Sequence, residues 1–132
     1  MDRLARKFET ARKFVPVPVK EVSGTSRAGI IAYGTSHWAL TEACDQLKKE
    51  HNLPMDYLRV RAYPFTQEVH DFIRDHDRVY VVEQNRDAQM FQLLKLDIAA
   101  DQVVKLRSVL HYNGLPVDAR SITEAIISQE AK

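Results

Sequence analysis

The hydrophobic and polar positions of this chain alternate between strand-like and helix-like patterns. Two nearly continuous apolar runs, GIIAY at 29–33 and VYVVE at 79–83, are typical of strands that are buried on both faces. The predicted strands are Val19–Val22, Gly29–Tyr33, Tyr57–Arg61, Val79–Glu83 and Leu106–Leu110. Helical periodicity predicts helices at Ser36–His51, Thr66–His76, Asp87–Leu96, Ala100–Val104 and Ser121–Gln129. Strands alternating with helices of this length predict an α/β fold with a mainly parallel sheet covered on both faces.

The third predicted strand differs from the two apolar runs. In YLRVR, Leu58 and Val60 alternate with Tyr57, Arg59 and Arg61. We therefore expect one face of this strand to be less covered and the strand to lie nearer an edge of the sheet.

The first eighteen residues form a separate segment. Residues 1–14 predict a short helix with Leu4 and Phe8 on one face, and VPVPV then ends it, because proline disfavours helix at the preceding residue. We expect residues 1–18 to be a helical arm and linker, and residues 19–132 to be the domain. The basic residues of the arm suggest nucleic acid or a membrane as a partner. Acidic residues interrupt the basic run, however, and this favours a solvated helix that packs on a neighbouring domain.

Charge and cysteine content narrow the function classes. The net charge of +1 gives no strong field for nucleic acid or an anionic membrane. The single cysteine can form neither an internal disulfide nor a thiolate metal cluster. No apolar run approaches the roughly 20 residues of a membrane helix, and the N-terminus has no apolar signal core. We expect a cytoplasmic protein.

The turn GTSHW, at 34–38, is the first candidate site. Gly34 allows a tight turn, and the hydroxyl of Thr35 or Ser36 could cap the following helix. Free backbone N–H groups there would also suit an anion. However, the three spaced glycines of a dinucleotide fingerprint and the Gly-Lys-Ser/Thr ending of a phosphate loop are both missing, so a structural turn is favoured.

The end of the strand at 79–83 is the second candidate site. Glu83 could act as a general base, but no histidine, lysine or second acid is fixed beside it by the local sequence. A polar interface or an internal Glu–Arg pair is favoured, and Asp87 is expected to cap the next helix.

The helix at 36–51 carries two further candidates. Leu40, Ala43, Cys44 and Leu47 share one face, so Cys44 is predicted to be buried and unreactive. Trp38 lies on the opposite side, where it either serves an interface or folds over the loops of its own domain. The histidines show no metal-binding spacing, and we expect no metal site.

Taken together, several segments resemble the last domain of the α subunit of 2-oxoacid:ferredoxin oxidoreductases, the 2-oxoglutarate or pyruvate type. They are GIIAYGTSHWALTEACDQL, LRVRAYPF, RVYVVEQNRDAQM and LHYNGLPVDARSITEAI, and ARKFETARKFVPVPV resembles the connector that leads into this domain. The resemblance implies a three-layer α/β/α sandwich like the transketolase C-terminal domain. Its five-stranded, mostly parallel sheet has an antiparallel first strand, which Val19–Val22 fits.

The resemblance also places the strand containing Ile31 between those containing Val60 and Val81. The turns that follow these strands should then meet at one edge of the sheet. We expect that edge to dock on another domain or subunit. The candidate interface residues are Gly34, Thr35, Ser36, Trp38, Tyr63, Phe65, Glu83, Gln84, Asn85 and Arg86.

The chemistry that the resemblance implies is oxidative decarboxylation of a 2-oxoacid to an acyl-CoA, with electrons passed to ferredoxin. The complete enzyme uses thiamine diphosphate, magnesium, coenzyme A and iron–sulfur clusters. This chain has no Gly-Asp-Gly motif for diphosphate and magnesium, and one cysteine cannot ligate a cluster. We therefore expect no catalytic, cofactor-binding or metal-binding residues in this chain. It would be a docking domain whose partners are the other α-subunit domains and the β subunit, and indirectly ferredoxin. A free-standing domain that binds a small ligand or nucleotide, and a regulatory interaction module, are the alternatives.

Overall fold

The computed structural model describes residues 1–132, and it contains one sheet flanked by helices. The strands are β1 (Val19–Glu21), β2 (Ala28–Tyr33), β3 (Asp56–Val60), β4 (Arg78–Glu83) and β5 (Leu106–Leu110). The α-helices are α1 (Asp2–Ala11), α2 (His37–His51), α3 (Gln67–Asp75), α4 (Gln89–Asp97), α5 (Ala100–Val103) and α6 (Ala119–Glu130). A single 3₁₀ turn, η1 (Gly34–Ser36), precedes α2. All five predicted strands are present.

The strand order is β1-β3-β2-β4-β5. β1 pairs with β3 antiparallel, and the other three pairings are parallel. This order confirms the mixed sheet and the position of β2 between β3 and β4. It also confirms that β3 lies next to an edge strand.

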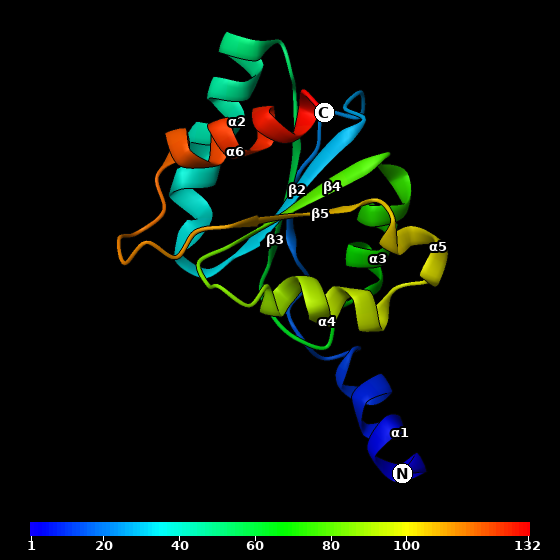
Figure 1. Ribbon diagram of the computed structural model, residues 1–132. Coiled ribbons are helices and arrows are strands. Elements are labelled where there is room, and N and C mark those ends of the chain that lie inside the picture. Colours follow the sequence, from blue (N-terminus) through cyan, green and yellow to red (C-terminus); the bar gives the residue numbers. More distant parts are fainter.

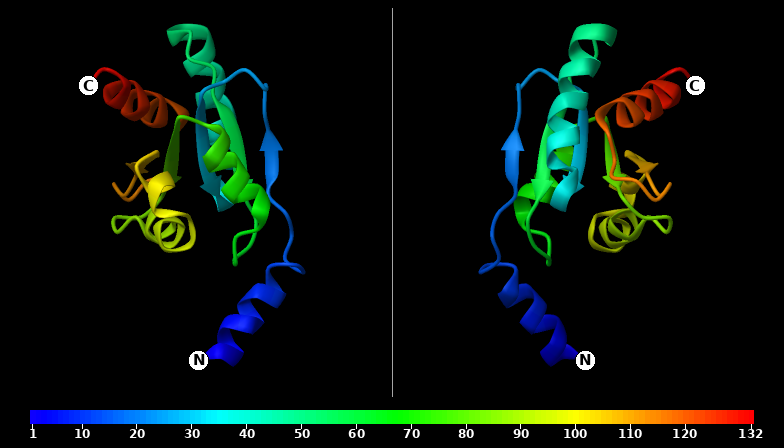
Figure 2. Two further views of the ribbon diagram at one scale, coloured as in Figure 1. Left: turned by 90° about the vertical axis from the view of Figure 1, so that its right-hand side faces the viewer. Right: turned by 90° about the vertical axis from the view of Figure 1, so that its left-hand side faces the viewer.

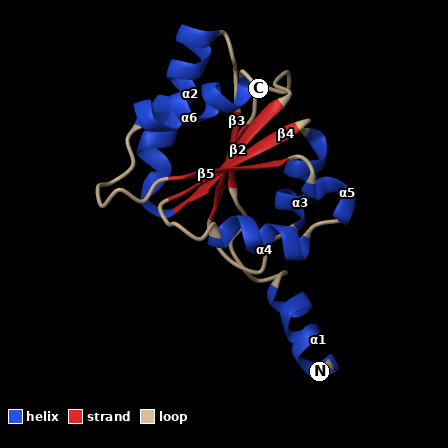
Figure 3. Ribbon diagram, viewed as in Figure 1, coloured by secondary structure: helices blue, strands red, loops and turns tan.

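The helices form two layers around the sheet. In Figure 1, α2 and α6 lie on one side of the strands, and α3, α4 and α5 lie on the other. Figure 3 shows the strands as a central layer between helices. The three-layer α/β/α sandwich is therefore confirmed.

Each side of the sheet has its own core, because successive side chains of a strand point to opposite faces. Ile30 and Ala32 of β2 face α2 and α6, whereas Ile31 faces the side of α3 and α4. Tyr57 of β3 is only 2% exposed and belongs to the core under α2 and α6. The prediction that one face of β3 is less covered therefore fails at Tyr57 and holds farther along the same face, where Arg59 is partly exposed and Arg61 is exposed.

Helix α1 stands apart from these layers. None of its residues is buried, and the two views of Figure 2 show it projecting away from the sheet. The exposed side chains of Leu4 and Phe8 add apolar area to the surface of α1. No helix of the structure combines the length and the apolar character that crossing a membrane requires.

Candidate functional site

The turns that follow β2 and β4 meet at the edge of the sheet where the parallel strands end, which we call the carboxyl edge. The amide of Gln84 donates hydrogen bonds to the hydroxyls of Thr35 (3.2 Å) and Ser36 (3.0 Å). Gln84 also accepts a hydrogen bond from the backbone N–H of Val117 (3.0 Å), so it joins three segments. The predicted meeting of these turns is observed.

The turn after β3 completes the carboxyl edge and shapes a groove there. This carboxyl-edge groove has a volume of about 230 Å³, and seven of the nine residues that line it are hydrophobic. Tyr63 stands at its rim and packs edge-on against Phe65, with ring centroids 5.2 Å apart. The lining residues are Tyr33, Gly34, Val60, Arg61, Ala62, Tyr63, Phe65, Met90 and Leu93.

Three of the ten predicted interface residues are buried. Phe65 is fully buried in the core on the side of α3 and α4. Ser36 is 3% exposed, and Glu83 has no exposed surface. The remaining seven reach the surface, six of them exposed and one partly buried: Gly34, Thr35, Trp38, Tyr63, Gln84 and Arg86, and Asn85.

Glu83 is buried because it caps α4 from the end of β4. Its Oε1 accepts hydrogen bonds from the backbone N–H of Met90 (2.6 Å) and from Asn85 Nδ2 (3.0 Å). Its Oε2 accepts from the N–H of Phe91 (3.0 Å). The carboxylate therefore fills the N-terminus of α4, where helices bind anions, and it is not free to act as a general base.

The prediction that Asp87 caps this helix is wrong. Helix α4 begins at Gln89, and Ala88 before it has a left-handed backbone (φ 52°) that turns the chain between Asp87 and the helix. Asp87 pairs with Arg86 instead, at 2.8 Å between Nε and Oδ1. The internal Glu–Arg pair considered for Glu83 is therefore also not formed.

The N-terminus of α2 differs from its prediction as well. Neither Thr35 nor Ser36 makes a side-chain capping bond. Ser36 has a helical backbone (φ −67°, ψ −13°) instead of the extended backbone of an N-cap, and both hydroxyls accept hydrogen bonds from Gln84. Gly34 has a left-handed backbone (φ 63°), the conformation that favours glycine at a tight turn.

Burial also controls the ionisation of a tyrosine beside the groove. Tyr33 is partly buried, and its hydroxyl lies 3.4 Å from Asn85 Nδ2. Burial raises the pKa of Tyr33 above its usual value, and the negative charge of Glu83 adds to this effect. Tyr33 therefore presents a neutral phenol, suited to hydrogen bonding at an interface.

Trp38 and Cys44 lie on α2, away from the groove. Trp38 is 79% exposed and contacts the ring of His37, with centroids 4.8 Å apart, so it does not fold back over the loops of its own domain. Cys44 is half-buried at the margin of a face on which Leu40, Ala43 and Leu47 are buried. The predicted full burial of Cys44 is therefore too strong, although burial raises the pKa of its thiol to about 12.

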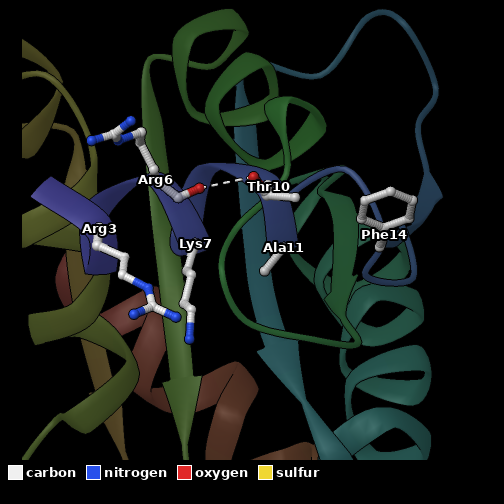
Figure 4. A pocket seen from close by; sticks show the side chains of 6 residues that line it. All are labelled: Arg3, Arg6, Lys7, Thr10, Ala11 and Phe14. Atoms are coloured by element: carbon white, nitrogen blue, oxygen red, sulfur yellow. Dashed lines mark hydrogen bonds between the residues drawn. The ribbon is translucent and has the colours of Figure 1, made fainter.

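The arm brings more apolar area to the carboxyl edge. The ring of Phe8 packs edge-on against Tyr63, with centroids 6.2 Å apart. Another side of α1 is basic: Arg3, Arg6 and Lys7 line a shallow hollow, and Figure 4 shows Arg3 and Lys7 extending to the same side of the helix. Because only residues of the arm line this hollow, it is an open stretch of helix surface and not an enclosed site.

The structure groups no three His, Cys, Asp or Glu side chains in a way that could hold a metal ion. The polar atoms at the carboxyl edge instead hydrogen-bond to one another. The edge as a whole offers an apolar groove bordered by aromatic side chains and amides, which is chemistry suited to recognition.

Comparisons with known proteins identify the fold. No protein-family model matches the sequence, and no curated protein matches it. A similar solved structure is the 2-oxoglutarate:ferredoxin oxidoreductase from Magnetococcus marinus with 2-oxoglutarate, coenzyme A and succinyl-CoA bound, with a TM-score of 0.77 at 20% identity. The match covers 94% of this chain and 21% of that chain.

A second similar structure is the alpha chain of a probable 2-oxoacid ferredoxin oxidoreductase from Thermoplasma acidophilum. Its TM-score is 0.57 at 22% identity, and the match covers 88% of this chain and 98% of that chain. Both structures agree with the resemblance seen in the sequence. This chain has the fold of a domain of the 2-oxoacid:ferredoxin oxidoreductases.

Proposed function

We propose that this chain is a non-catalytic docking domain of the α subunit of a 2-oxoacid:ferredoxin oxidoreductase. The complete enzyme would convert a 2-oxoacid to an acyl-CoA and reduce ferredoxin. Thiamine diphosphate, magnesium, coenzyme A and the iron–sulfur clusters would be held by other parts of that enzyme. In support, the single cysteine, Cys44, cannot supply the thiolates of a cluster.

The observation that carries this proposal is the exposed apolar surface at the carboxyl edge. Tyr63 is 50% exposed and Leu93 is 38% exposed, and both border the carboxyl-edge groove. Phe8 of the arm continues this surface through its contact with Tyr63. Protein interfaces combine such an apolar centre with a polar rim, here supplied by Gln84 and Arg86. The partners would be the other α-subunit domains and the β subunit.

The alternative of a nucleotide-binding or small-ligand domain is less well supported. The carboxyl-edge groove, at about 230 Å³, is smaller than the roughly 300–1,000 Å³ of ordinary ligand pockets. A phosphate at the start of α4 would also have to displace the carboxylate of Glu83 from Met90 and Phe91.

Co-purification from the cells that make the protein tests the proposal. A tagged chain should bring down the remaining subunits, identified by mass spectrometry, and the complex should reduce ferredoxin when a 2-oxoacid and coenzyme A are supplied. The double variant Tyr63→Asp/Leu93→Asp should reduce the amount of bound partner about tenfold or more, because charges would enter an apolar contact. Its far-ultraviolet circular dichroism should match that of the wild type.

The matched control is Tyr112→Asp/Leu115→Asp, which changes two exposed side chains on the loop between β5 and α6. This control should assemble normally. Trp38→Ala and Arg86→Ala then test whether the interface extends beyond the groove. If the wild type captures no such subunits, the family proposal is wrong; if the Tyr63/Leu93 variant assembles like the control, the docking surface is wrong.

A further inference from the structure

A buried carboxylate and a buried imidazole meet at the opposite end of the sheet. Asp56 is the first residue of β3 and is 2% exposed; His76 follows α3 and is 5% exposed. His76 Nε2 lies 3.1 Å from Asp56 Oδ2. The proposed docking at the carboxyl edge involves neither residue.

The hydrogen-bond partners of the two side chains show how many protons the pair holds. His76 Nδ1 lies 2.7 Å from the carbonyl oxygen of Phe72, and a carbonyl only accepts, so Nδ1 carries a hydrogen. Nε2 faces a carboxylate oxygen, which also only accepts when it is ionised. A hydrogen must therefore lie between Nε2 and Oδ2, either on the ring or on the carboxyl group. In both cases the pair holds one proton more than a neutral imidazole beside an ionised carboxylate.

The other oxygen of Asp56 fastens the loop after β1. Oδ1 accepts hydrogen bonds from the backbone N–H of Ser23 (2.8 Å) and from its hydroxyl (2.9 Å). Strand β1 has only three residues and no buried side chain, so apart from its backbone pairing with β3 it has no packed contact that holds this edge of the sheet. Asp56 thus joins the β1 loop to β3, and through His76 it joins both to the end of α3.

We propose that Asp56 and His76 form a proton-binding site that fastens β1 and the end of α3 to β3 and loosens them when the proton is lost. Without the proton, two acceptors would face each other in a buried place, and an unsatisfied buried polar group is costly. The fastening at this edge of the sheet therefore depends on pH.

Neighbouring charges nearly balance around the pair. Lys20 of β1 lines the adjoining groove, together with Asp71 and Asp75 of α3, and Arg74 pairs with both of these carboxylates. Glu21 of β1 adds one negative charge, and Asp77 after His76 is paired with Arg27. From β2 the pair meets Gly29, which has no side chain. From α2 the nearby titratable group is the neutral thiol of Cys44. The direct hydrogen bonds of Asp56 and His76, and not the surrounding charges, therefore determine whether the folded pair keeps its extra proton.

The sign of the pH effect follows from the unfolded chain. There, histidine titrates near pH 6.5 and aspartate near pH 3.9, so at pH 8 the unfolded pair holds no extra proton. The folded state then binds more protons than the unfolded state, and stability falls as pH rises. The unfolding equilibrium constant should increase by up to about tenfold per pH unit above pH 7, until the folded pair also loses its proton.

Asp56→Asn is the informative variant, because it keeps every hydrogen bond without the extra proton. The Asn carbonyl can accept from Ser23, and the Asn NH₂ can donate to the unprotonated Nε2 of a neutral His76, whose Nδ1–H still donates to Phe72. We expect this variant to fold and to lose the pH effect.

Calorimetric unfolding at pH 8 in two buffers of different ionisation enthalpy measures the protons released. The wild type should release about one proton more than Asp56→Asn, and amide exchange at residues 19–23 should quicken at high pH only in the wild type, after correction for intrinsic rates. His51→Gln, which changes an exposed histidine, should behave like the wild type. Equal proton release in wild type and Asp56→Asn overturns the proposal.

A measurement on the wild type makes the test independent of how the variant folds. NMR at pH 8 reports the ring nitrogens of His76 through their ¹⁵N shifts and the carboxyl group of Asp56 through its ¹³C shift. A doubly protonated ring, or a protonated carboxyl group beside a neutral ring, supports the site. A neutral ring beside an ionised carboxylate overturns it.

Discussion

The guanidinium of Arg12 and the carboxylate of Asp97 form a two-point ion pair between the end of α1 and the end of α4. Nη1 lies 2.9 Å from Oδ2, and Nη2 lies 2.9 Å from Oδ1. The side chains are only 23% and 16% exposed, and His70 Nε2 approaches the same carboxylate at 2.9 Å. This pair holds the C-terminal end of α1 against α4, and so it sets the position of the arm relative to the carboxyl edge.

Replacing Arg12 by lysine should loosen the arm while the charge is kept. A lysine ammonium is a point charge and cannot reproduce the two parallel contacts of a guanidinium. We expect a loss of about 1–2 kcal/mol in the free energy of unfolding and faster amide exchange in α1. Urea unfolding and hydrogen exchange measure the two effects. Arg3→Lys, which changes an exposed side chain without an ion pair, is the control, and equal behaviour of the two variants would contradict the assigned role.

The same ion pair should fail in acid. The hydrogen bond from Arg12 lowers the pKa of Asp97, burial opposes this shift, and His70 supports it. Because the folded pKa lies below the unfolded value of about 3.9, the stabilisation is complete above that value and is lost as pH falls through the folded pKa. The difference in unfolding free energy between wild type and Asp97→Asn should therefore shrink between pH 5 and pH 2. A difference that stays constant over this range would show that ionisation of Asp97 contributes nothing.

The sequence predicts the elements of this fold well because its signals are local. The apolar run at Gly29–Tyr33 and the helical period after it indicate β2 and α2 within one or two residues of the observed bounds. The order of the strands rests on the family resemblance, since periodicity does not say which strands pair.

The candidate site was harder to predict because its details depend on contacts between distant residues. Tyr63 and Phe65 are two aromatic residues in one turn, and only the position of α3 and α4 decides that Phe65 enters the core. Glu83 caps a helix that starts six residues later, beyond the reach of any local capping motif. Asp56 and His76 meet across β3 and α3, and no spacing in the sequence marks them.

Glu83→Gln should destabilise the start of α4. In the wild type, the two carboxylate oxygens of Glu83 accept from the backbone N–H groups of Met90 and Phe91. The carbonyl oxygen of a glutamine can replace one of these acceptors, but its NH₂ group would face the other N–H, and both groups are donors. One buried donor then loses its partner, at a cost of about 1–3 kcal/mol. Chemical denaturation measures the loss. Glu124→Gln, on the exposed side of α6, should change stability little; a similarly small change for Glu83→Gln would mean that the cap contributes little to stability.

Gly29→Ala should destabilise the protein for steric reasons. A Cβ at position 29 would lie 2.6 Å from Cε1 and 2.7 Å from Cζ of Phe72, and 3.4 Å from Cγ of His76. Phe72 is 3% exposed, so its ring has little room to move away. Overpacking of this kind costs about 1–3 kcal/mol. Urea denaturation should show a loss of this size.

The control for this clash is Gly24→Ala, where a Cβ would meet nothing within 4 Å but the backbone is left-handed (φ 76°). It should cost about 1–2 kcal/mol through backbone strain alone. Double-mutant cycles with Phe72→Leu distinguish the steric clash at position 29 from the backbone strain at position 24. Leucine lacks the ring atoms Cε1 and Cζ with which the new methyl group would clash. Phe72→Leu should therefore offset part of the cost of Gly29→Ala and none of the cost of Gly24→Ala. If the effects of Gly29→Ala and Phe72→Leu simply add, the packing of Phe72 against β2 is not what requires glycine at position 29.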